Sequence, residues 1–248
     1  MCLLSMGLAL VLAFRTDLGI SAALRLSLAH SSFLGVRLLH AIEATNVGSP
    51  REFKAYRIEV SILEFDAIMD RGPREAAMAA AERYARAARQ RGGPREMARA
   101  AAQGGRMRAG LGQCRAAVAQ LDEAMAGRWS EPWAAPFCLD RLEWLRDGGD
   151  YDAAIETFGQ FARWHAGSQW ADSAVTEVWK AYQRAGRREA GLRALAALGS
   201  RYPGTPLQAA IARTVEAEAH SPPPPPIPSS PAPPGGSPAS KASVAPAG

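Results

Sequence analysis

The chain has 248 residues, of which 48% are hydrophobic and 21% charged, and its formal net charge is +5. This composition excludes a wholly disordered chain, because it supplies enough apolar side chains for a sizeable core in one or two domains. Its 3 cysteines form neither a C-x-x-C pair nor a cluster with histidine, which argues against a zinc site and a disulfide framework. The basic excess is mostly arginine; it suits acidic partners, although a GC-rich genome explains the bias more simply.

Residues 1–14 are apolar and uncharged, and their number matches the hydrophobic region of a signal peptide. They are too few for a comfortable transmembrane helix. Ser21-Ala22-Ala23 offers a small-residue cleavage site, but no positively charged segment precedes the apolar stretch. We expect residues 1–23 to be a signal or an N-terminal anchor that contacts a membrane through residues 1–14. The alternative is a cytoplasmic chain that keeps this segment.

Helical spacing of apolar residues begins after this segment. Residues 20–45 predict one amphipathic helix. A capping serine, a proline and a glutamate in Ser49-Pro50-Arg51-Glu52 predict the start of the next helix. Proline and glutamate recur after Gly72 and after Gly93, and predict two further starts. Helical spacing then predicts shorter helices over residues 113–127, 135–147, 150–165, 169–185, 187–201 and 206–219.

The end of the chain differs from the rest in composition. Of the 28 residues from Ser221 to Gly248, 11 are proline, and most others are serine, alanine or glycine. Such a segment cannot bury enough apolar surface to offset its ordering entropy. We therefore predict a disordered proline-rich tail over residues 220–248. No segment of useful length alternates as a strand does, so the sequence predicts an all-α protein.

Three glycines, Gly112, Gly149 and Gly186, lie 37 residues apart, and similar sequence follows each of them. One step of 40 residues extends this series back to Gly72. A fixed period between about 20 and 50 residues is typical of stacked-repeat proteins. Stacked helix pairs form binding surfaces far more often than catalytic sites.

The residues after two of these glycines have a packing role. Ala117 is followed four positions later by Leu121, and Ala154 by Phe158. The small residue lets two helices approach closely, and the bulky residue fills the gap to the next pair. One pair alone leaves an apolar face in water, so several pairs must stack.

The segment from Phe137 to Pro206 resembles the tetratricopeptide repeat family, in which helix pairs carry small and bulky residues at set places. Gly191 stands where that family has alanine. The boundary Arg201-Tyr202-Pro203-Gly204-Thr205 is similar to that of bacterial envelope proteins of the outer-membrane assembly lipoprotein and TolA-binding type. The other residues that match the tetratricopeptide repeat family are Gly112, Gly149, Gly186, Tyr151, Ala154, Phe158 and Tyr182.

The resemblance implies a right-handed superhelix of antiparallel helix pairs over residues 24–219. The expected repeats lie near residues 58–94, 98–131, 135–168 and 172–205, with a final helix over residues 206–219. It also implies a non-enzymatic scaffold or adaptor that docks peptide segments of partner proteins on its concave face. The similar proteins imply a bacterial cell envelope location, periplasmic or membrane-anchored.

In the resembled family, the first helix of each pair lines the peptide groove. Carried over to this chain, the groove residues are Arg99, Arg106, Leu139, Glu143, Arg146, Thr176, Lys180 and Arg184. Five of these are cationic and one is acidic, so the resemblance implies an acidic or carboxylate-bearing peptide as ligand.

An arginine-rich stretch gives the alternative function. Residues 83–115 contain nine arginines, and Glu96 is their only acid. This density suits a binder of nucleic acid or of an anionic membrane surface. Tyr84 is the only aromatic residue there, so base stacking is not indicated and nucleic acid is the less favoured partner. A solvated helix face combined with codon bias is the favoured explanation of these arginines. The candidate anion patch comprises Arg86, Arg89, Arg91 and Arg95.

No catalytic constellation is recognised, so the sequence predicts no enzyme and no cofactor. The histidines are predicted to lie at no metal-ligand spacing with another histidine, a cysteine or an acid, so no metal site is expected. His165 occupies a repeat boundary, where we expect it to pack. Trp133 and Trp170 lie near helix starts; core packing is the favoured expectation for them, and partial exposure as interface anchors is the alternative. The four histidines are His30, His40, His165 and His220.

Overall fold

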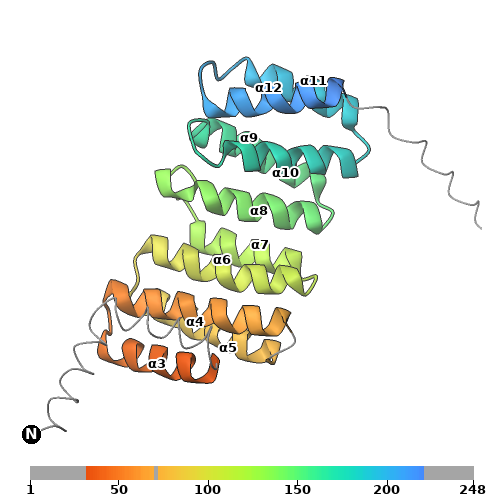
Figure 1. Ribbon diagram of the computed structural model, residues 1–248. Helices are drawn as coiled ribbons and strands as arrows, with labels where there is room; N and C mark the ends of the chain where they lie inside the picture. Colours follow the sequence, from red (N-terminus) through yellow and green to blue (C-terminus); the bar gives the residue numbers. More distant parts are fainter. Residues whose placement is uncertain (1–31, 70–71, 221–248) are drawn as a thin grey trace, which may run out of the picture.

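The computed structural model describes residues 32–69 and 72–220, and this part of the chain is entirely helical (Figure 1). The predicted signal or anchor over residues 1–23 and the tail from residue 221 lie outside the described residues. The helices are α3 (Ser32–Thr45), α4 (Pro50–Ile68), α5 (Arg74–Arg91), α6 (Pro94–Gly110), α7 (Cys114–Met125), α8 (Ala135–Asp147), α9 (Tyr151–His165), α10 (Ala171–Arg184), α11 (Arg188–Gly199) and α12 (Pro206–Ala219), with a short 3-10 turn at Pro132–Ala134 before α8.

Consecutive helices pack as pairs, and the pairs follow one another along one direction from α3 to α12 (Figure 1). The pairs are α4 with α5, α6 with α7, α8 with α9, and α10 with α11. The first helix of each pair also contacts the first helix of the next, from α4 through α6, α8 and α10 to α12. The second helices, α5, α7, α9 and α11, therefore form a separate layer.

The helix boundaries follow local sequence signals. The predicted helices over residues 135–147 and 206–219 are confirmed without a shift, and the neighbouring predictions differ by one or two residues at their ends. Ser49 caps α4 by accepting hydrogen bonds from the backbone N–H groups of Arg51 and Glu52. Thr205 caps α12 in the same way, 3.3 Å from the nitrogen of Gln208. Such caps satisfy N–H groups that have no partner inside the helix.

The three glycines at intervals of 37 residues close identical turns. Gly112, Gly149 and Gly186 have φ angles of +75°, +79° and +69°. At each turn the next residue donates its N–H to the carbonyl five positions back, as Asp150 does to Leu145 at 2.9 Å. This left-handed Schellman ending favours glycine, which has no Cβ to clash. Gly72 lies between α4 and α5, but its φ angle is not in the left-handed region. The extension of the glycine series to Gly72 was therefore wrong, because this residue does not form the same turn.

The core runs through the stack between the two layers. Ala117 and Ala154 are fully buried, as are Leu121 and, nearly so, Phe158, which confirms the predicted small-and-bulky packing. Around Tyr84 in the earlier pairs, alanine supplies most of the core: Ala80, Ala81, Ala87, Ala88 and Ala100. Small side chains of this kind let α4, α5 and α6 pack closely against one another.

Two glycines are required by close approach of an aromatic ring. A Cβ atom on Gly105 in α6 would overlap the indole ring of Trp144 from α8. A Cβ atom on Gly191 in α11 would lie 2.6 Å from Cγ of Tyr182 in α10. Gly191, where the resembled family has alanine, is therefore explained by the position of Tyr182.

Among residues 32–69 and 72–220, none of the helices combines the length and the apolar character that crossing a bilayer requires.

We predict that Gly105→Ala destabilises the protein although alanine favours helices. The new methyl group must displace a buried indole, which should cost about 1–3 kcal/mol in the free energy of unfolding. Gly159→Ala in α9 is the matched control, because a Cβ atom there meets nothing within 4 Å. This control should stabilise by roughly 0.5–1 kcal/mol. Urea unfolding followed by circular dichroism measures both, and equal stabilisation by the two substitutions would contradict the proposed contact.

Candidate functional site

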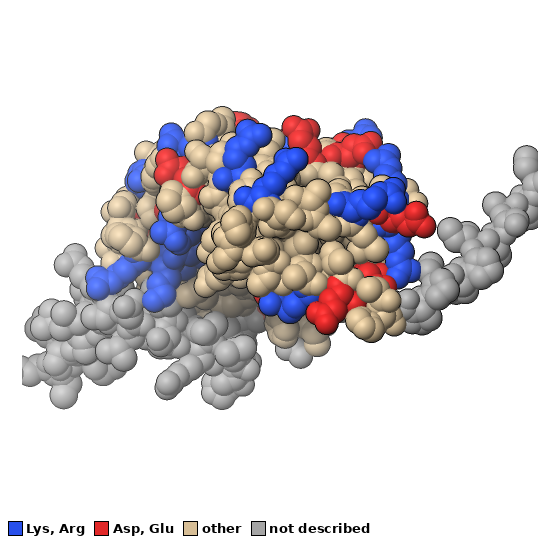
Figure 2. All heavy atoms as spheres, turned by 90° about the horizontal axis from the view of Figure 1, so that it is seen from above, with Lys and Arg blue, Asp and Glu red and all other residues tan. Residues whose placement is uncertain are grey.

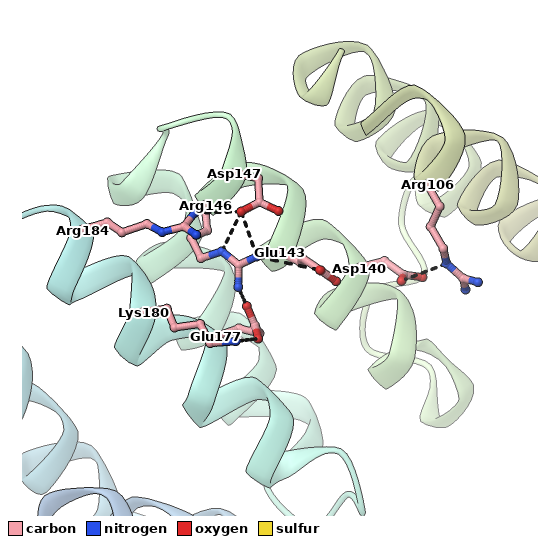
Figure 3. A network of polar contacts seen from close by, with 8 residues as sticks. All are labelled: Arg106, Asp140, Glu143, Arg146, Asp147, Glu177, Lys180 and Arg184. Carbon is pink, nitrogen blue, oxygen red and sulfur yellow. Dashed lines mark hydrogen bonds and ion pairs between the residues drawn. The ribbon is translucent and has the colours of Figure 1, made fainter. Parts of the chain in front are cut away.

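The predicted peptide-groove residues lie on the layer of first helices. Arg99 and Arg106 come from α6, Leu139, Glu143 and Arg146 from α8, and Thr176, Lys180 and Arg184 from α10. Figure 3 shows that most of the charged ones meet acidic side chains, which come from their own helix or from the neighbouring first helix. We call this surface the charged face, and it comprises Arg106, Asp140, Glu143, Arg146, Asp147, Glu177, Lys180 and Arg184 (Figure 3).

Arg146 is the centre of the charged face. Only 6% of this residue is exposed, although its guanidinium carries a full charge. It contacts Asp147 at 2.8 Å and Glu143 at 3.8 Å on its own helix, and it pairs with Glu177 of α10 (Figure 3). A buried charge needs such partners, because an unpaired ion in the interior is very costly. Arg146 therefore joins α8 to α10.

The remaining cations of the charged face also have acidic partners. Lys180 lies 2.8 Å from Glu177, Arg184 lies 2.8 Å from Asp147, and Arg106 lies 3.4 Å from Asp140. Burial alone would raise the pKa of the Asp147 carboxyl, but hydrogen bonds from Arg146 and Arg184 outweigh it and hold that pKa below its usual value. Burial raises the pKa of Asp140, which the more distant Arg106 offsets only in part.

The charge of this surface differs from the sequence-based expectation. The five cations of the predicted groove are Arg99, Arg106, Arg146, Lys180 and Arg184, and they contact five carboxylates: Glu96, Asp140, Glu143, Asp147 and Glu177. The surface is thus balanced, and it is not cationic as predicted. The acids were missed because the residues carried over from the family were chosen by position, and Asp140, Asp147 and Glu177 lie beside those positions. Figure 2, which looks at the α11–α12 end of the stack, likewise shows both signs of charge close together.

The two uncharged residues of the predicted peptide groove offer few free hydrogen-bonding groups to a ligand. Leu139 is half-buried. Thr176 is exposed, but its hydroxyl donates a hydrogen bond of 2.9 Å to the carbonyl of Asp172 in the preceding turn. A ligand on the charged face would therefore meet groups that already have partners.

A second surface lies between the second helices α5 and α7, with α6 beneath them. Two adjoining hollows there have volumes of about 580 and 360 Å³ and share Ala85, Arg89, Gln120 and Glu123. We call them together the α5–α7 groove. Its further lining residues are Met78, Ala81, Glu82, Arg86, Met97, Ala101, Gly104, Arg108, Ala116, Ala119, Ala124, Ala126 and Arg128.

The predicted anion patch divides at this groove. Arg86 and Arg89 line it, are exposed, and form no ion pair within the described part of the chain. Arg91 instead contacts the buried carboxylate of Glu52 at 2.5 Å, so it is not a free member of the patch. Arg95 is exposed in the first turn of α6 and does not line the groove.

The wider arginine-rich stretch is partly neutralised in the same way. Arg83 pairs with Glu59, Arg99 pairs with Glu96, and Arg106 pairs with Asp140. Apart from Glu96, these acids lie outside residues 83–115. The count of nine arginines to one acid therefore overstates the positive charge that a partner would meet.

A cluster that the sequence reasoning missed joins α3 to α4. Ligand atoms of His40, Glu43 and Glu59 all lie within 4.8 Å of one another. Burial first, and then the neighbouring Glu59, raises the pKa of the Glu43 carboxyl to about 9. The prediction that no histidine stands at metal-ligand spacing with an acid was wrong for His40, because Glu43 follows one helical turn later. The third member, Glu59, is 19 residues from His40 and only packing brings it near.

The prediction that His165 packs at a repeat boundary is confirmed. His165 is buried, and its Nε2 lies 2.8 Å from the carbonyl oxygen of Trp129, as expected of a packing histidine at a boundary. Cys114 and Cys138 are buried and free. Trp133 is half-buried and Trp170 is exposed, so the favoured core packing was wrong for Trp170. Trp164, which the sequence did not single out, is exposed as well.

We predict that Arg146→Met destabilises the protein by about 3–5 kcal/mol, because it leaves the acidic groups around Glu177 without their buried counter-charge. Methionine keeps the packing of the arginine stem, so the change tests the charge. Lys180→Met removes an exposed partner of the same Glu177 and should cost less than about 1 kcal/mol. Chemical unfolding of both variants provides the comparison, and equal losses would show that Arg146 has no special role.

Comparisons with known proteins provide no relative for this chain. No model of a protein family, no curated protein and no solved structure matches it. What the chain does must therefore be inferred from its own geometry.

Proposed function

We propose that this protein is a non-enzymatic scaffold that docks an acidic segment of a partner protein in the α5–α7 groove. One observation carries this proposal. The arginines of the groove that face solvent, Arg86 and Arg89, have no ion-pair partner in the described residues, whereas every cation of the charged face has one.

The contrast matters because of what an acidic ligand must displace. A carboxylate that binds Arg184 or Lys180 competes with Asp147 or Glu177, so one ion pair is exchanged for another. A carboxylate that binds Arg86 or Arg89 forms a contact without breaking one. Across the groove, four arginines (Arg86, Arg89, Arg108 and Arg128) face two acids (Glu82 and Glu123), which favours an anionic partner.

The shape and lining of the groove favour a peptide over a simple anion. Between the charged residues lie apolar side chains, including Met78, Ala85 and Met97, and the small residues Ala101 and Gly104 form part of the floor. An amphipathic helix with an apolar face and acidic flanks fits this lining. Its apolar face would be buried against these side chains, and its acidic flanks would pair with the arginines. This placement differs from the first-helix groove that the family resemblance implies.

We also propose that the stack is a tetratricopeptide-like superhelix in a bacterial envelope. The repeated Schellman turns at Gly112, Gly149 and Gly186, and the small-and-bulky packing of Ala154 with Phe158, support the first part. The apolar residues 1–14 and the resemblance to envelope proteins support the second. Cell fractionation with N-terminal sequencing tests the location, and an intact cytoplasmic chain would contradict it.

The second candidate function is binding to an anionic surface, a membrane or a nucleic acid. The same unpaired Arg86 and Arg89 favour it, because phosphates attract exposed arginines as carboxylates do. It differs from peptide docking in its response to salt. Binding to duplex DNA or to anionic vesicles should weaken steeply as salt rises, and it needs no apolar face on the ligand.

We expect a synthetic amphipathic helix, with glutamates on one face and leucines on the other, to bind saturably in fluorescence anisotropy. Reversing the groove charges with Arg86→Glu and Arg89→Glu should weaken its affinity by about tenfold or more. The same peptide with glutamine for glutamate should bind less well to the unmodified protein.

Two matched double variants sharpen this experiment. Arg163→Glu with Arg201→Glu reverses two exposed arginines outside the groove, and should leave the affinity near that of the unmodified protein. Arg106→Glu with Lys180→Glu alters the charged face instead. Loss of binding in this second variant alone would place docking on the charged face, and equal loss in all three would reduce the effect to net charge.

A further inference from the structure

The cluster of His40, Glu43 and Glu59 has the arrangement of a cation site. His40 and Glu43 project from α3 one turn apart, and Glu59 comes from the middle of α4. Nε2 of His40 lies 2.8 Å from Oε1 of Glu59, and all three ligand atoms lie within 4.8 Å of one another. Two helices thus direct one nitrogen and two carboxylate donors to a common point.

Burial of the two carboxylates is the second observation. Glu43 is 8% exposed and Glu59 is 1% exposed. One buried oxygen of each, Oε1 of Glu43 and Oε2 of Glu59, has no hydrogen-bond partner. Buried polar atoms are rarely left unsatisfied, because the cost of removing them from water is then not recovered. Either a proton shared between the two carboxyl groups or a bound cation would satisfy these two oxygens, and a cation would find them unused as ligands.

We propose that His40, Glu43 and Glu59 bind one divalent transition-metal cation of the Zn²⁺ type. A neutral imidazole nitrogen with carboxylate oxygens suits Zn²⁺ and its first-row neighbours. Mg²⁺ and Ca²⁺ prefer oxygen ligands throughout, so a site with histidine discriminates against them. Two carboxylates also carry the charge that one divalent cation neutralises.

Arg83 of α5 is the competitor for this position. Its guanidinium lies 3.1 Å from Nε2 of His40 and pairs with the carboxylate of Glu59. Its side chain is 36% exposed, so it can turn to solvent when a cation takes its place.

The surroundings permit entry of an ion and leave the fold intact without it. The side chain of His40 is 48% exposed, which opens the cluster to solvent on that side. A separate ion pair, between the buried Glu52 and the exposed Arg91, joins α4 to α5. Metal binding is therefore expected to add stability to a structure that Arg83 already holds together.

The test is calorimetric titration of the full chain with ZnCl₂, with MgCl₂ as the comparison. We expect one saturable site for Zn²⁺ and none for Mg²⁺. His40→Ala should weaken the affinity for Zn²⁺ by more than about tenfold, which is the loss expected when a residue that only supports a metal ligand is removed. Glu59→Gln should abolish the site. Arg83→Gln should strengthen binding, because it removes the competing cation. That gain is the signature that a nonspecific surface site would not give.

Controls separate this site from others on the molecule. His220→Ala removes an exposed histidine far along the chain, and should leave Zn²⁺ binding unchanged. Circular dichroism confirms that each variant is folded, and if Glu59→Gln is not, the half-exposed His40→Ala decides. The proposal is overturned if neither the unmodified protein nor Arg83→Gln binds Zn²⁺. It is also overturned if binding persists undiminished in His40→Ala.

Discussion

Each of the three later helix pairs depends on a chain reversal so tight that the residue at its corner must be left-handed. Gly112, Gly149 and Gly186 supply that residue, and the Schellman hydrogen bonds that follow fix how the second helix returns along the first. The small residues Ala117 and Ala154 then let the two helices meet without a gap. The core, the two layers of helices and the surfaces that they present all follow from this repeated local geometry.

The charges of the molecule are organised by the stacking of these pairs. Several ion pairs join residues about one repeat apart, such as Arg106 with Asp140, Asp147 with Arg184, and Asp172 with Arg213, at separations of 34, 37 and 41 residues. Most are exposed and contribute little individually. Arg146 differs because it is buried, and it links two successive first helices. The same pairing neutralises the charged face, whereas Arg86 and Arg89 in the α5–α7 groove have no ion-pair partner among the described residues.

The two proposed sites make different use of polar groups that lack partners. In the α5–α7 groove, the unpaired Arg86 and Arg89 are exposed. Water solvates their charges, so they carry no desolvation cost until a ligand binds. In the His40 cluster the unpaired atoms are carboxylate oxygens in the interior, where they are costly. The first situation suits a reversible partner of opposite charge. The second suits a small cation that enters the protein and replaces weaker compensation by Arg83.

The sequence by itself determined the features that depend on near neighbours: the all-α class, the starts of α4 and α12 at their caps, and the glycine turns. These follow from hydrogen bonds within a few residues, which the local sequence specifies. It also pointed to Arg86 and Arg89 as candidate anion binders. Only the tertiary structure decided which arginines remain unpaired, since Asp140 reaches Arg106 and Glu52 reaches Arg91 across 34 and 39 residues. It alone brought Glu59 to His40 and Glu43, because contacts between helices depend on their packing and not on any local pattern.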